Sequence, residues 1–156
     1  MEVAMSDRLS PDQRSRLMSK VRHKDTEAER RVRSFLHARG FRFRKNVSTL
    51  AGSPDIVLPK YKAIVFVHGC FWHGHSGCRK SRLPSTRTDF WCQKVATNQR
   101  RDRKKIADLM NSGWRVAVIW QCALERSENF RAYMEELMQW IPSALEQYEI
   151  PSSEKP

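Results

Sequence analysis

Histidine and cysteine side chains gather in one short segment, residues 68–78, which holds three of the five histidines and two of the four cysteines. Imidazoles and thiols are the ligands that zinc and other transition metals prefer. Cys70, His75 and Cys78 are spaced as three such ligands, and the glycines between them allow the backbone to curl around an ion. The segment therefore predicts a structural zinc site, whose fourth ligand must come from elsewhere.

Two cysteines and one histidine compete for that fourth position. Cys122 directly follows an apolar run that predicts a strand, so it is the better candidate on geometric grounds. Cys92 lies inside a predicted helix, where we interpret it as a buried or free thiol, and His73 is the competing histidine ligand. Four cysteines in a reducing compartment favour metal binding over disulfides.

A carboxylate and two histidines indicate phosphodiester hydrolysis. Asp55 opens a predicted strand, and His68 closes the next one, opposite Asp55 if the two strands form a tight hairpin. A hard cation such as Mg²⁺ binds oxygen, which Asp55 and the backbone carbonyl of Val67 could supply. His73 remains free for proton transfer if zinc uses the other nearby histidine. Together these groups would let a metal-bound water attack a phosphodiester.

Three large aromatic side chains lie in polar or basic surroundings: Phe71, Trp72 and Trp91. Apolar wedges of this kind unstack base pairs at a cost of about a few kcal/mol per step, least at a mispaired site. Phe71 and Trp72 lie between candidate metal and catalytic residues, so we predict that they face a nucleic acid. Trp91 lies on a predicted helix and fits a core position about as well.

The charge of the chain supports a nucleic-acid partner. Lys and Arg outnumber Asp and Glu by 29 to 17, which gives a net charge of +12 and a pI near 10.1. Folding gains nothing from this excess, whereas a polyanion such as nucleic acid would attract it. No apolar run reaches the roughly 18 residues of a membrane span, and the N-terminus lacks the apolar core of a signal peptide. We therefore expect a soluble intracellular protein of one domain.

Capping signals and apolar periodicity predict an α/β fold with a mixed central sheet flanked by helices. Thr26 and Glu29 match a capping box at the start of a helix. This local role is enough to explain a glutamate at position 29 without any catalytic function. The predicted helices are 11–22, 26–39, 88–110 and 127–140, and the predicted strands are 41–45, 55–58, 63–67 and 114–120.

Several motifs occur in a fixed order along most of the chain. They are Met18, Asp-Thr (25–26) with Glu29, Gly-Ser-Pro-Asp (52–55), His-Gly-Cys-Phe-Trp-His (68–73), Pro-Ser-Thr-Arg-Thr-Asp-Phe-Trp (84–91), Asn98 with Arg-Asp-Arg (101–103), Gly-Trp-Arg-Val (113–116) and Trp-Gln-Cys-Ala-Leu (120–124). With this set, the chain resembles the very short patch repair (Vsr) family of DNA mismatch endonucleases.

The resemblance implies a restriction-endonuclease-like α/β fold and a Mg²⁺-dependent hydrolytic nick 5′ to the thymine of a T·G mismatch, the product of 5-methylcytosine deamination. It implies that Asp55 binds the catalytic Mg²⁺ together with the carbonyl of Val67. His73 would act on the attacking water, with His68 and Glu29 assisting.

The resemblance also implies the remaining ligands and DNA contacts. Zinc would lie on Cys70, His75, Cys78 and Cys122. Phe71, Trp72 and Trp91 would enter the duplex from the major groove, and Met18 from the minor-groove side. Two positions depart from the family pattern: Val67 is often Thr, which a backbone ligand tolerates, and the segment before Cys78 is one residue longer, so the loop is expected to bulge at Gly77.

We accordingly divide the chain into a basic arm that contacts DNA (residues 1–24), an endonuclease domain (residues 25–145) and a disordered tail (residues 146–156). The implied partners are double-stranded DNA with a T·G mismatch, mismatch-repair proteins and a repair DNA polymerase. The protein would act as a monomer in a bacterial cytoplasm, associated with the nucleoid. Two alternatives share much of the same evidence: a zinc-stabilised DNA-binding protein without catalysis, and a nuclease acting on RNA or single strands.

Overall fold

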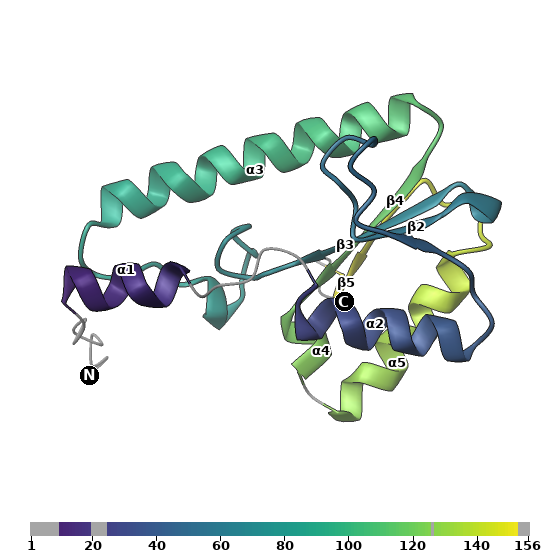
Figure 1. Ribbon diagram of the computed structural model, residues 1–156, viewed down its shortest axis with the longest axis horizontal. Coiled ribbons are helices and arrows are strands. Elements are labelled where there is room, and N and C mark those ends of the chain that lie inside the picture. Colours follow the sequence, from purple (N-terminus) through teal and green to yellow (C-terminus); the bar gives the residue numbers. More distant parts are fainter. Residues whose placement is uncertain (1–9, 20–24, 126, 153–156) are drawn as a thin grey trace.

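A five-stranded mixed sheet forms the centre of the molecule (Figure 1). The computed structural model describes residues 10–19, 25–125 and 127–152. The strands, in their order across the sheet, are β1 (Arg44–Lys45), β2 (Ile56–Leu58), β3 (Ala63–His68), β4 (Arg115–Trp120) and β5 (Gln147–Ile150). The first three strands pair antiparallel, whereas β3, β4 and β5 run parallel to one another.

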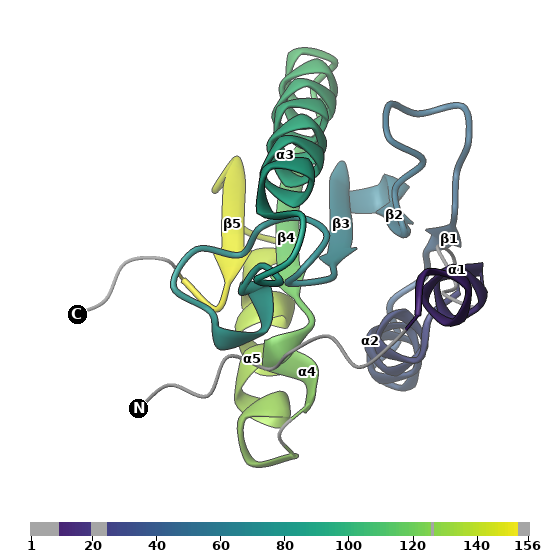
Figure 2. The same ribbon diagram turned by 90° about the vertical axis from the view of Figure 1, so that its left-hand side faces the viewer.

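Helices cover both faces of this sheet (Figure 2). The helices are α1 (Pro11–Ser19), α2 (Glu27–Ala38), α3 (Thr88–Asn111), α4 (Cys122–Glu125) and α5 (Ser127–Trp140), with short 3-10 turns η1 (Pro59–Tyr61) and η2 (Arg79–Ser81). One apolar cluster joins one face of the sheet to α2, α4 and α5, and a second joins the other face to α3. The predicted mixed α/β sheet flanked by helices is confirmed.

The two central strands have the composition expected of strands that are covered on both sides. In β3 and β4, β-branched and aromatic residues follow one another without a polar interruption, and nearly all of them are buried. Parallel strands covered by helices need such continuous apolar runs, because neither face meets water. The ends of these strands therefore lie inside the protein, where they can hold polar groups away from solvent.

Capping boxes begin two helices, one of them the predicted box of Thr26 and Glu29. The Ser10 hydroxyl accepts a hydrogen bond from the Gln13 backbone at the start of α1, and Gln13 accepts one from the Ser10 backbone. At the start of α2, the Thr26 hydroxyl accepts from the Glu29 N–H, while the Glu29 carboxylate accepts from the Asp25 N–H. These reciprocal bonds satisfy backbone donors that a helix start leaves unpaired.

The prediction of a disordered tail over residues 146–156 is wrong for residues 147–150. They form β5, which extends the sheet beside β4. Ile150 is fully buried, and Tyr148 packs against the same apolar cluster as α5. A strand of four residues with two glutamate or glutamine side chains shows little apolar pattern, so only its pairing with β4 reveals it.

Other elements differ from the sequence prediction in length. The strand expected at 41–45 is reduced to the two residues of β1, and the 59–62 connection is a 3-10 turn rather than a simple hairpin loop. Helix α4 was not predicted. Helix α1 is described to Ser19, so residues 20–22 of the predicted helix lie outside the described residues.

Helix α3 is long enough to join the sheet to the histidine–cysteine segment. It has 24 residues, and only its second half packs on the sheet, through Leu109. Its first half extends past the ends of the strands, over the loop that follows β3 (Figure 1). Trp91 and Val95 on this half are buried. Within the described residues, no helix has the combined length and apolar character needed to cross a membrane.

Candidate active site

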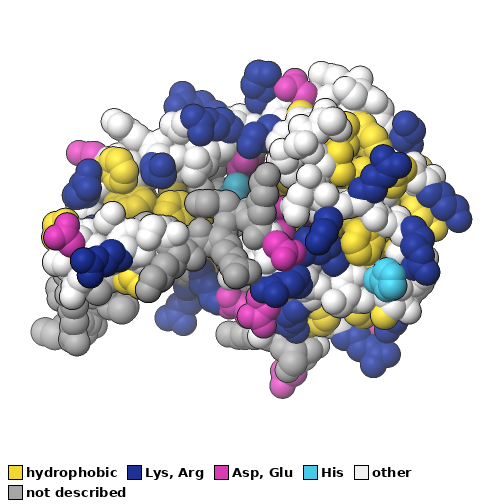
Figure 3. Space-filling model, in the orientation of Figure 1, with side chains coloured by type: hydrophobic (Ala, Val, Ile, Leu, Met, Phe, Trp, Pro, Cys, Tyr) yellow, Lys and Arg dark blue, Asp and Glu magenta, His cyan; other side chains and the backbone are white. Residues whose placement is uncertain are grey.

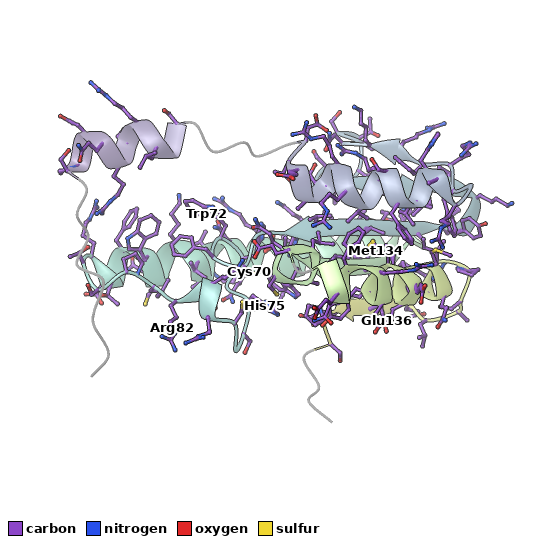
Figure 4. The ribbon with its side chains drawn as sticks, turned by 90° about the horizontal axis from the view of Figure 1, so that it is seen from below. Cys70, Trp72, His75, Arg82, Met134 and Glu136 are labelled. Atoms are coloured by element: carbon purple, nitrogen blue, oxygen red, sulfur yellow. The ribbon has the colours of Figure 1, made fainter. Side chains whose placement is uncertain are left out.

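Four candidate metal ligands meet where the loop after β3 joins the sheet: Cys70, His75, Cys78 and Cys122. One ligand atom from each lies within 4.8 Å of those of the others, and His75 Nδ1 is 3.5 Å from Cys122 Sγ. Ligands of a tetrahedral zinc ion lie about 3.3–3.8 Å apart, because Zn–N and Zn–S bonds measure about 2.1 and 2.3 Å. The set is therefore close to the geometry that zinc requires. Figure 4 shows Cys70 and His75 together in this region.

The structure distinguishes the three candidates for the fourth ligand. Cys122 is the first residue of α4 and is separated from the end of β4 only by Gln121, which brings its thiol to the loop. Cys92 is exposed on α3 and lies outside the cluster, so it is a free thiol and not a buried one. His73 belongs to a second group, with His68 and Asp102.

The loop between the ligands depends on two glycines with left-handed backbone angles. Gly74 has φ of +64°, and a β-carbon there would lie 2.4 Å from Gln99 Nε2 and 2.7 Å from Val95 Cγ1. Only glycine therefore lets α3 approach this closely. Gly77 has φ of +72° with no atom within 4 Å of a β-carbon, which agrees with a bulge turned toward solvent.

Two thiols of the cluster, Cys70 and Cys122, hold their protons more strongly than an ordinary cysteine. Burial raises the pKa of Cys70 to about 12, and burial likewise raises the pKa of Cys122. A zinc ion would deprotonate both thiols, since it binds the thiolate form.

Asp55 and Val67 come together at the edge between β2 and β3. The backbone N–H of Val67 donates to Asp55 Oδ2 over 2.7 Å, just beyond the last paired residue of β2. In an antiparallel pair, the N–H and C=O of one residue point to the same side of the strand. The Val67 carbonyl therefore lies on the same side as the Asp55 carboxylate, and two oxygens suitable for a hard cation share this edge.

Burial raises the pKa of Asp55 to about 7. The Val67 hydrogen bond and the charges of Arg33 and His73 act in the opposite direction, whereas the charge of Glu29 adds to the rise. Ionising Asp55 in this buried place is costly unless a positive charge lies beside it. A bound cation would therefore stabilise the ionised carboxylate strongly.

Two histidines stack beside this carboxylate. The rings of His68 and His73 are 3.9 Å apart between centroids and inclined by only 5°. Burial and the neighbouring charge of His73 lower the pKa of His68 to about 3, so His68 is neutral. His73 is part-exposed, and its Nδ1 lies 2.6 Å from Asp102 Oδ2.

Asp102 is a site residue that the sequence prediction did not assign. It lies on α3, 29 positions from His73, and its carboxylate holds Nδ1 of that ring. Burial acts to raise the pKa of Asp102, but the hydrogen bond with His73 and nearby positive charges keep it below its ordinary value. The Arg-Asp-Arg motif (101–103), one of the motifs that carry the family resemblance, was the available signal.

Helix α3 also holds the loop by two side-chain amides that the prediction missed. Asn98 donates to the Trp72 carbonyl over 2.9 Å, and Gln99 donates to the Gly74 carbonyl over 3.1 Å. Successive residues of one helix thus fix the loop on both sides of His73. Spacing along the sequence could not show this, since 25 or more positions separate donors from acceptors.

Glu29 is buried and has two functions in the structure. It completes the capping box of α2, as predicted, and it lies near Arg33 and close enough to Asp55 for its charge to act there. Arg33 is itself buried, and its guanidinium pairs with Asp25 as well as Glu29. Glu29 therefore borders the candidate cation site rather than lying apart from it.

Aromatic side chains form one cluster at the far end of the loop. Phe71, Trp72 and Trp91 contact one another, with ring centroids 5.1–6.0 Å apart. Phe71 and Trp72 are part-exposed, whereas Trp91 is only 7% exposed. Phe90, 43% exposed, packs on Trp91. Phe71 and Trp72 are thus accessible as predicted, and Trp91 lies under them.

Basic side chains are spread widely over the molecule. Several Lys and Arg side chains lie over α3 and around the sheet on the face seen in Figure 3. Helix α1 is largely exposed, and its backbone includes Met18, whose side chain lies outside the described residues. The predicted contact of Met18 with DNA stays a prediction.

Comparison with known proteins shows which family the chain belongs to. The family described as DNA mismatch endonuclease Vsr matches residues 6–80. The type II nicking enzyme V.XorIIP of Xanthomonas oryzae is 54% identical over 120 residues, 77% of this chain and 88% of that enzyme. The chain belongs to the Vsr family of DNA mismatch endonucleases. The Vsr resemblance inferred from sequence is thereby confirmed.

Other Vsr relatives cover still more of the chain. The type II nicking enzyme V.NmeAIP of Neisseria meningitidis is 43% identical over 141 residues, 90% of this chain and all of that enzyme. The DNA mismatch endonuclease Vsr of Escherichia coli is 42% identical over 130 residues, 82% of this chain and 83% of its own. This Vsr protein is therefore a nuclease, and a zinc-stabilised DNA-binding protein without catalysis is the weaker hypothesis.

Asp102→Asn is expected to lower the nicking rate by about a hundredfold, because the amide no longer fixes the proton on Nδ1 of His73. DNA affinity and thermal stability should change little. Single-turnover nicking of a mismatched duplex measures the effect, and Asp108→Asn, an exposed position of α3, is the matched control. Equal rates for the two variants would show that the Asp102–His73 pair has no part in catalysis.

Proposed function

We propose that the protein nicks one strand of a DNA duplex 5′ to the thymine of a T·G mismatch, by Mg²⁺-dependent hydrolysis, and so starts very short patch repair of deaminated 5-methylcytosine. One observation supports this most directly. The Asp55 carboxylate, which accepts a hydrogen bond from the Val67 N–H, lies within electrostatic reach of His73. The His73 ring stacks on His68, and His73 follows Phe71 and Trp72 in the loop after β3.

In this proposal Asp55 and the Val67 carbonyl hold Mg²⁺, which would neutralise charge on the scissile phosphate. The stacked His73, fixed through Nδ1 by Asp102, takes a proton from the attacking water at Nε2. The water oxygen bonds to phosphorus as the P–O bond to the leaving strand breaks, and the leaving oxygen takes up a proton from solvent. Neutral His68 supports the ring of His73, and its single ring N–H could donate one hydrogen bond to the phosphate.

Glu29 assists from the side of α2. Its carboxylate is buried near Asp55, so it adds negative charge to the cation site. That charge favours binding of a divalent ion and disfavours an empty site. Its hydrogen bond to the Asp25 N–H keeps it in place.

A zinc ion on Cys70, His75, Cys78 and Cys122 would serve as a structural ion. The cysteine and histidine ligands would fill all four tetrahedral positions and leave none for water or substrate. The segment between the first two ligands contains Phe71, Trp72 and His73. A fixed metal loop would therefore hold the base-wedging rings and the proton acceptor at a constant separation.

The proposed DNA contacts are those that the family resemblance implies. Phe71 and Trp72 would enter the base stack from the major groove, and the arm of residues 1–24, with Met18, would approach from the minor groove. Trp91 can join them only if the aromatic cluster opens, because its ring is nearly covered. The excess of basic residues supplies phosphate contacts, as duplex binding requires.

Residues 25–145 would form the endonuclease domain, completed by β5. The proposal includes a monomer acting at the bacterial nucleoid, and contacts with mismatch-repair proteins and a repair DNA polymerase. Such contacts would follow the nick, since removal and resynthesis of the cut strand need other enzymes.

A panel of labelled substrates tests the reaction. The panel contains a duplex with one T·G mismatch in varied sequence contexts, the same duplex with T·A or C·G, the single strands, and an RNA duplex, each with Mg²⁺ and without it. The proposal predicts one nick, 5′ to the mismatched thymine, only with Mg²⁺. Equal cleavage of paired duplex would reject mismatch selectivity, and cleavage of RNA or single strands alone would favour the rival nuclease.

A further inference from the structure

Three side chains form a row across the parallel part of the sheet. His68 at the end of β3 is paired in register with Trp120 at the end of β4. On β5, Glu149 is paired with Val118, two residues before Trp120. Residues two apart on a strand face the same side, so His68, Trp120 and Glu149 lie on one face of three adjacent strands.

Trp120 contacts both sites described above. Its ring is stacked on the candidate zinc ligand His75, with centroids 4.2 Å apart and planes inclined by 5°. Its edge meets His68, with centroids 5.4 Å apart and an inclination of 72°. One buried indole thus touches a ligand of the candidate metal centre and a histidine of the hydrolytic site.

The orientation of this indole is fixed from β5. Trp120 is 8% exposed, and its Nε1–H donates to Glu149 Oε1 over 2.6 Å. A buried indole N–H without an acceptor is costly, and a carboxylate acceptor makes a stronger bond than a neutral one. The ring can therefore rotate only if this bond breaks. A segment whose sequence predicted disorder supplies the acceptor.

We propose that Trp120 and Glu149 form a positioning pair, which sets the ring plane of His75 toward the metal and the place of His68 beside His73. This inference rests on the proposed zinc and hydrolytic sites. Partners outside the ligand set commonly determine how a metal-binding histidine is oriented, and their loss typically costs about 10–100-fold in affinity or activity. The parallel stack of His75 on Trp120 is a contact of that type.

Glu149→Ala tests the pair, with Glu149→Gln as the conservative variant and Gln147→Ala as the matched control. Gln147 lies on the same strand with an exposed side chain. The measurements are the rate at which a chelator removes zinc from the protein, the visible spectrum of the cobalt(II)-substituted protein, and single-turnover nicking at saturating duplex. The first two readouts do not depend on the DNA substrate.

For Glu149→Ala we expect zinc removal about tenfold faster, shifted cobalt bands and a nicking rate about tenfold lower at unchanged DNA affinity. Glu149→Gln, which keeps an oxygen acceptor, should restore all three to within about twofold, and Gln147→Ala should match the parent protein. If Glu149→Ala loses zinc at the parent rate and has the cobalt bands of the parent protein, the inference is overturned, even if the variant is less stable to unfolding. A parent protein that takes up neither metal would overturn the zinc proposal, and this inference with it.

Discussion

Asp55→Asn is expected to abolish Mg²⁺-dependent nicking, with a fall of about a thousandfold or more in the single-turnover rate. A metal ligand contributes several kcal/mol to stabilising the transition state, and each 1.4 kcal/mol is about tenfold in rate. Asn keeps an oxygen that can accept the Val67 N–H, so the strand edge should persist. Binding of T·G duplex, measured by fluorescence anisotropy without Mg²⁺, should remain within about threefold of the parent protein.

The same substitution is expected to stabilise the Mg²⁺-free protein at high pH. Burial raises the pKa of Asp55 from 3.8 to about 7, so the folded state retains a proton that the unfolded state releases. The free energy of unfolding therefore falls as the pH rises from about 4 to about 7. Above pH 7 the folded protein bears the full free-energy cost of ionising the buried Asp55. Each pKa unit corresponds to about 1.4 kcal/mol, which sets an upper limit of about 4 kcal/mol.

Urea unfolding at pH 4.5 and pH 8, in buffer without Mg²⁺ or chelator, measures this effect. Asp55→Asn should exceed the parent protein in unfolding free energy at pH 8 and differ little at pH 4.5. Asp108→Asn, an exposed carboxylate on α3, should stay within about 0.5 kcal/mol at both values. If Asp55→Asn nicks at the parent rate, Asp55 is not a metal ligand. If its unfolding free energy at pH 8 equals that of the parent protein, the pKa of Asp55 is not raised.

Cys122→Ser is expected to remove the structural metal and to lower the melting temperature by about 10 °C or more. A closed cysteine–histidine site contributes directly to folding, and losing one ligand leaves a weakly bound ion. A loss of 3–5 kcal/mol corresponds to about 10 °C for a domain of this size. Elemental analysis should find about one zinc per chain in the parent protein and far less in the variant.

Cys92→Ser provides a close control, because Cys92 is an exposed cysteine outside the ligand cluster. It should keep its zinc and its melting temperature. Zinc binding releases thiol protons from Cys70 and Cys122, whose pKa values burial raises, so affinity should weaken as pH falls. A parent protein that remains fully folded after zinc removal would contradict a structural role for the metal.

Local patterns in the sequence were sufficient for much of the site. The capping box of Thr26 and Glu29, the apolar runs of β3 and β4 and the spacing of Cys70, His75 and Cys78 each depend on neighbours only a few positions away. Such patterns are encoded by adjacent residues, so a single sequence displays them. The alternation of apolar and polar residues that marks a strand covers only four positions in β5, two of them Gln or Glu, so it did not predict a strand there.

Contacts between distant segments required the tertiary structure. Asp102 joins His73 across 29 positions, and the Trp120–Glu149 bond spans another 29. The burial of Trp91 under Phe71 likewise depends on where α3 crosses the loop.

The sequence by itself determined which chemistry is present: zinc-type ligands, oxygen ligands for a hard cation, histidines for proton transfer and aromatic wedges, all within a basic α/β protein of the Vsr family. Tertiary structure decided which groups act on one another. It brought the predicted Cys122 to the other three ligands, paired Asp102 with His73, and made part of the predicted tail a strand beside β4. The physical reason is that ligand type is a property of single residues, whereas pKa values, ring orientation and metal geometry depend on groups that only folding brings within a few ångströms.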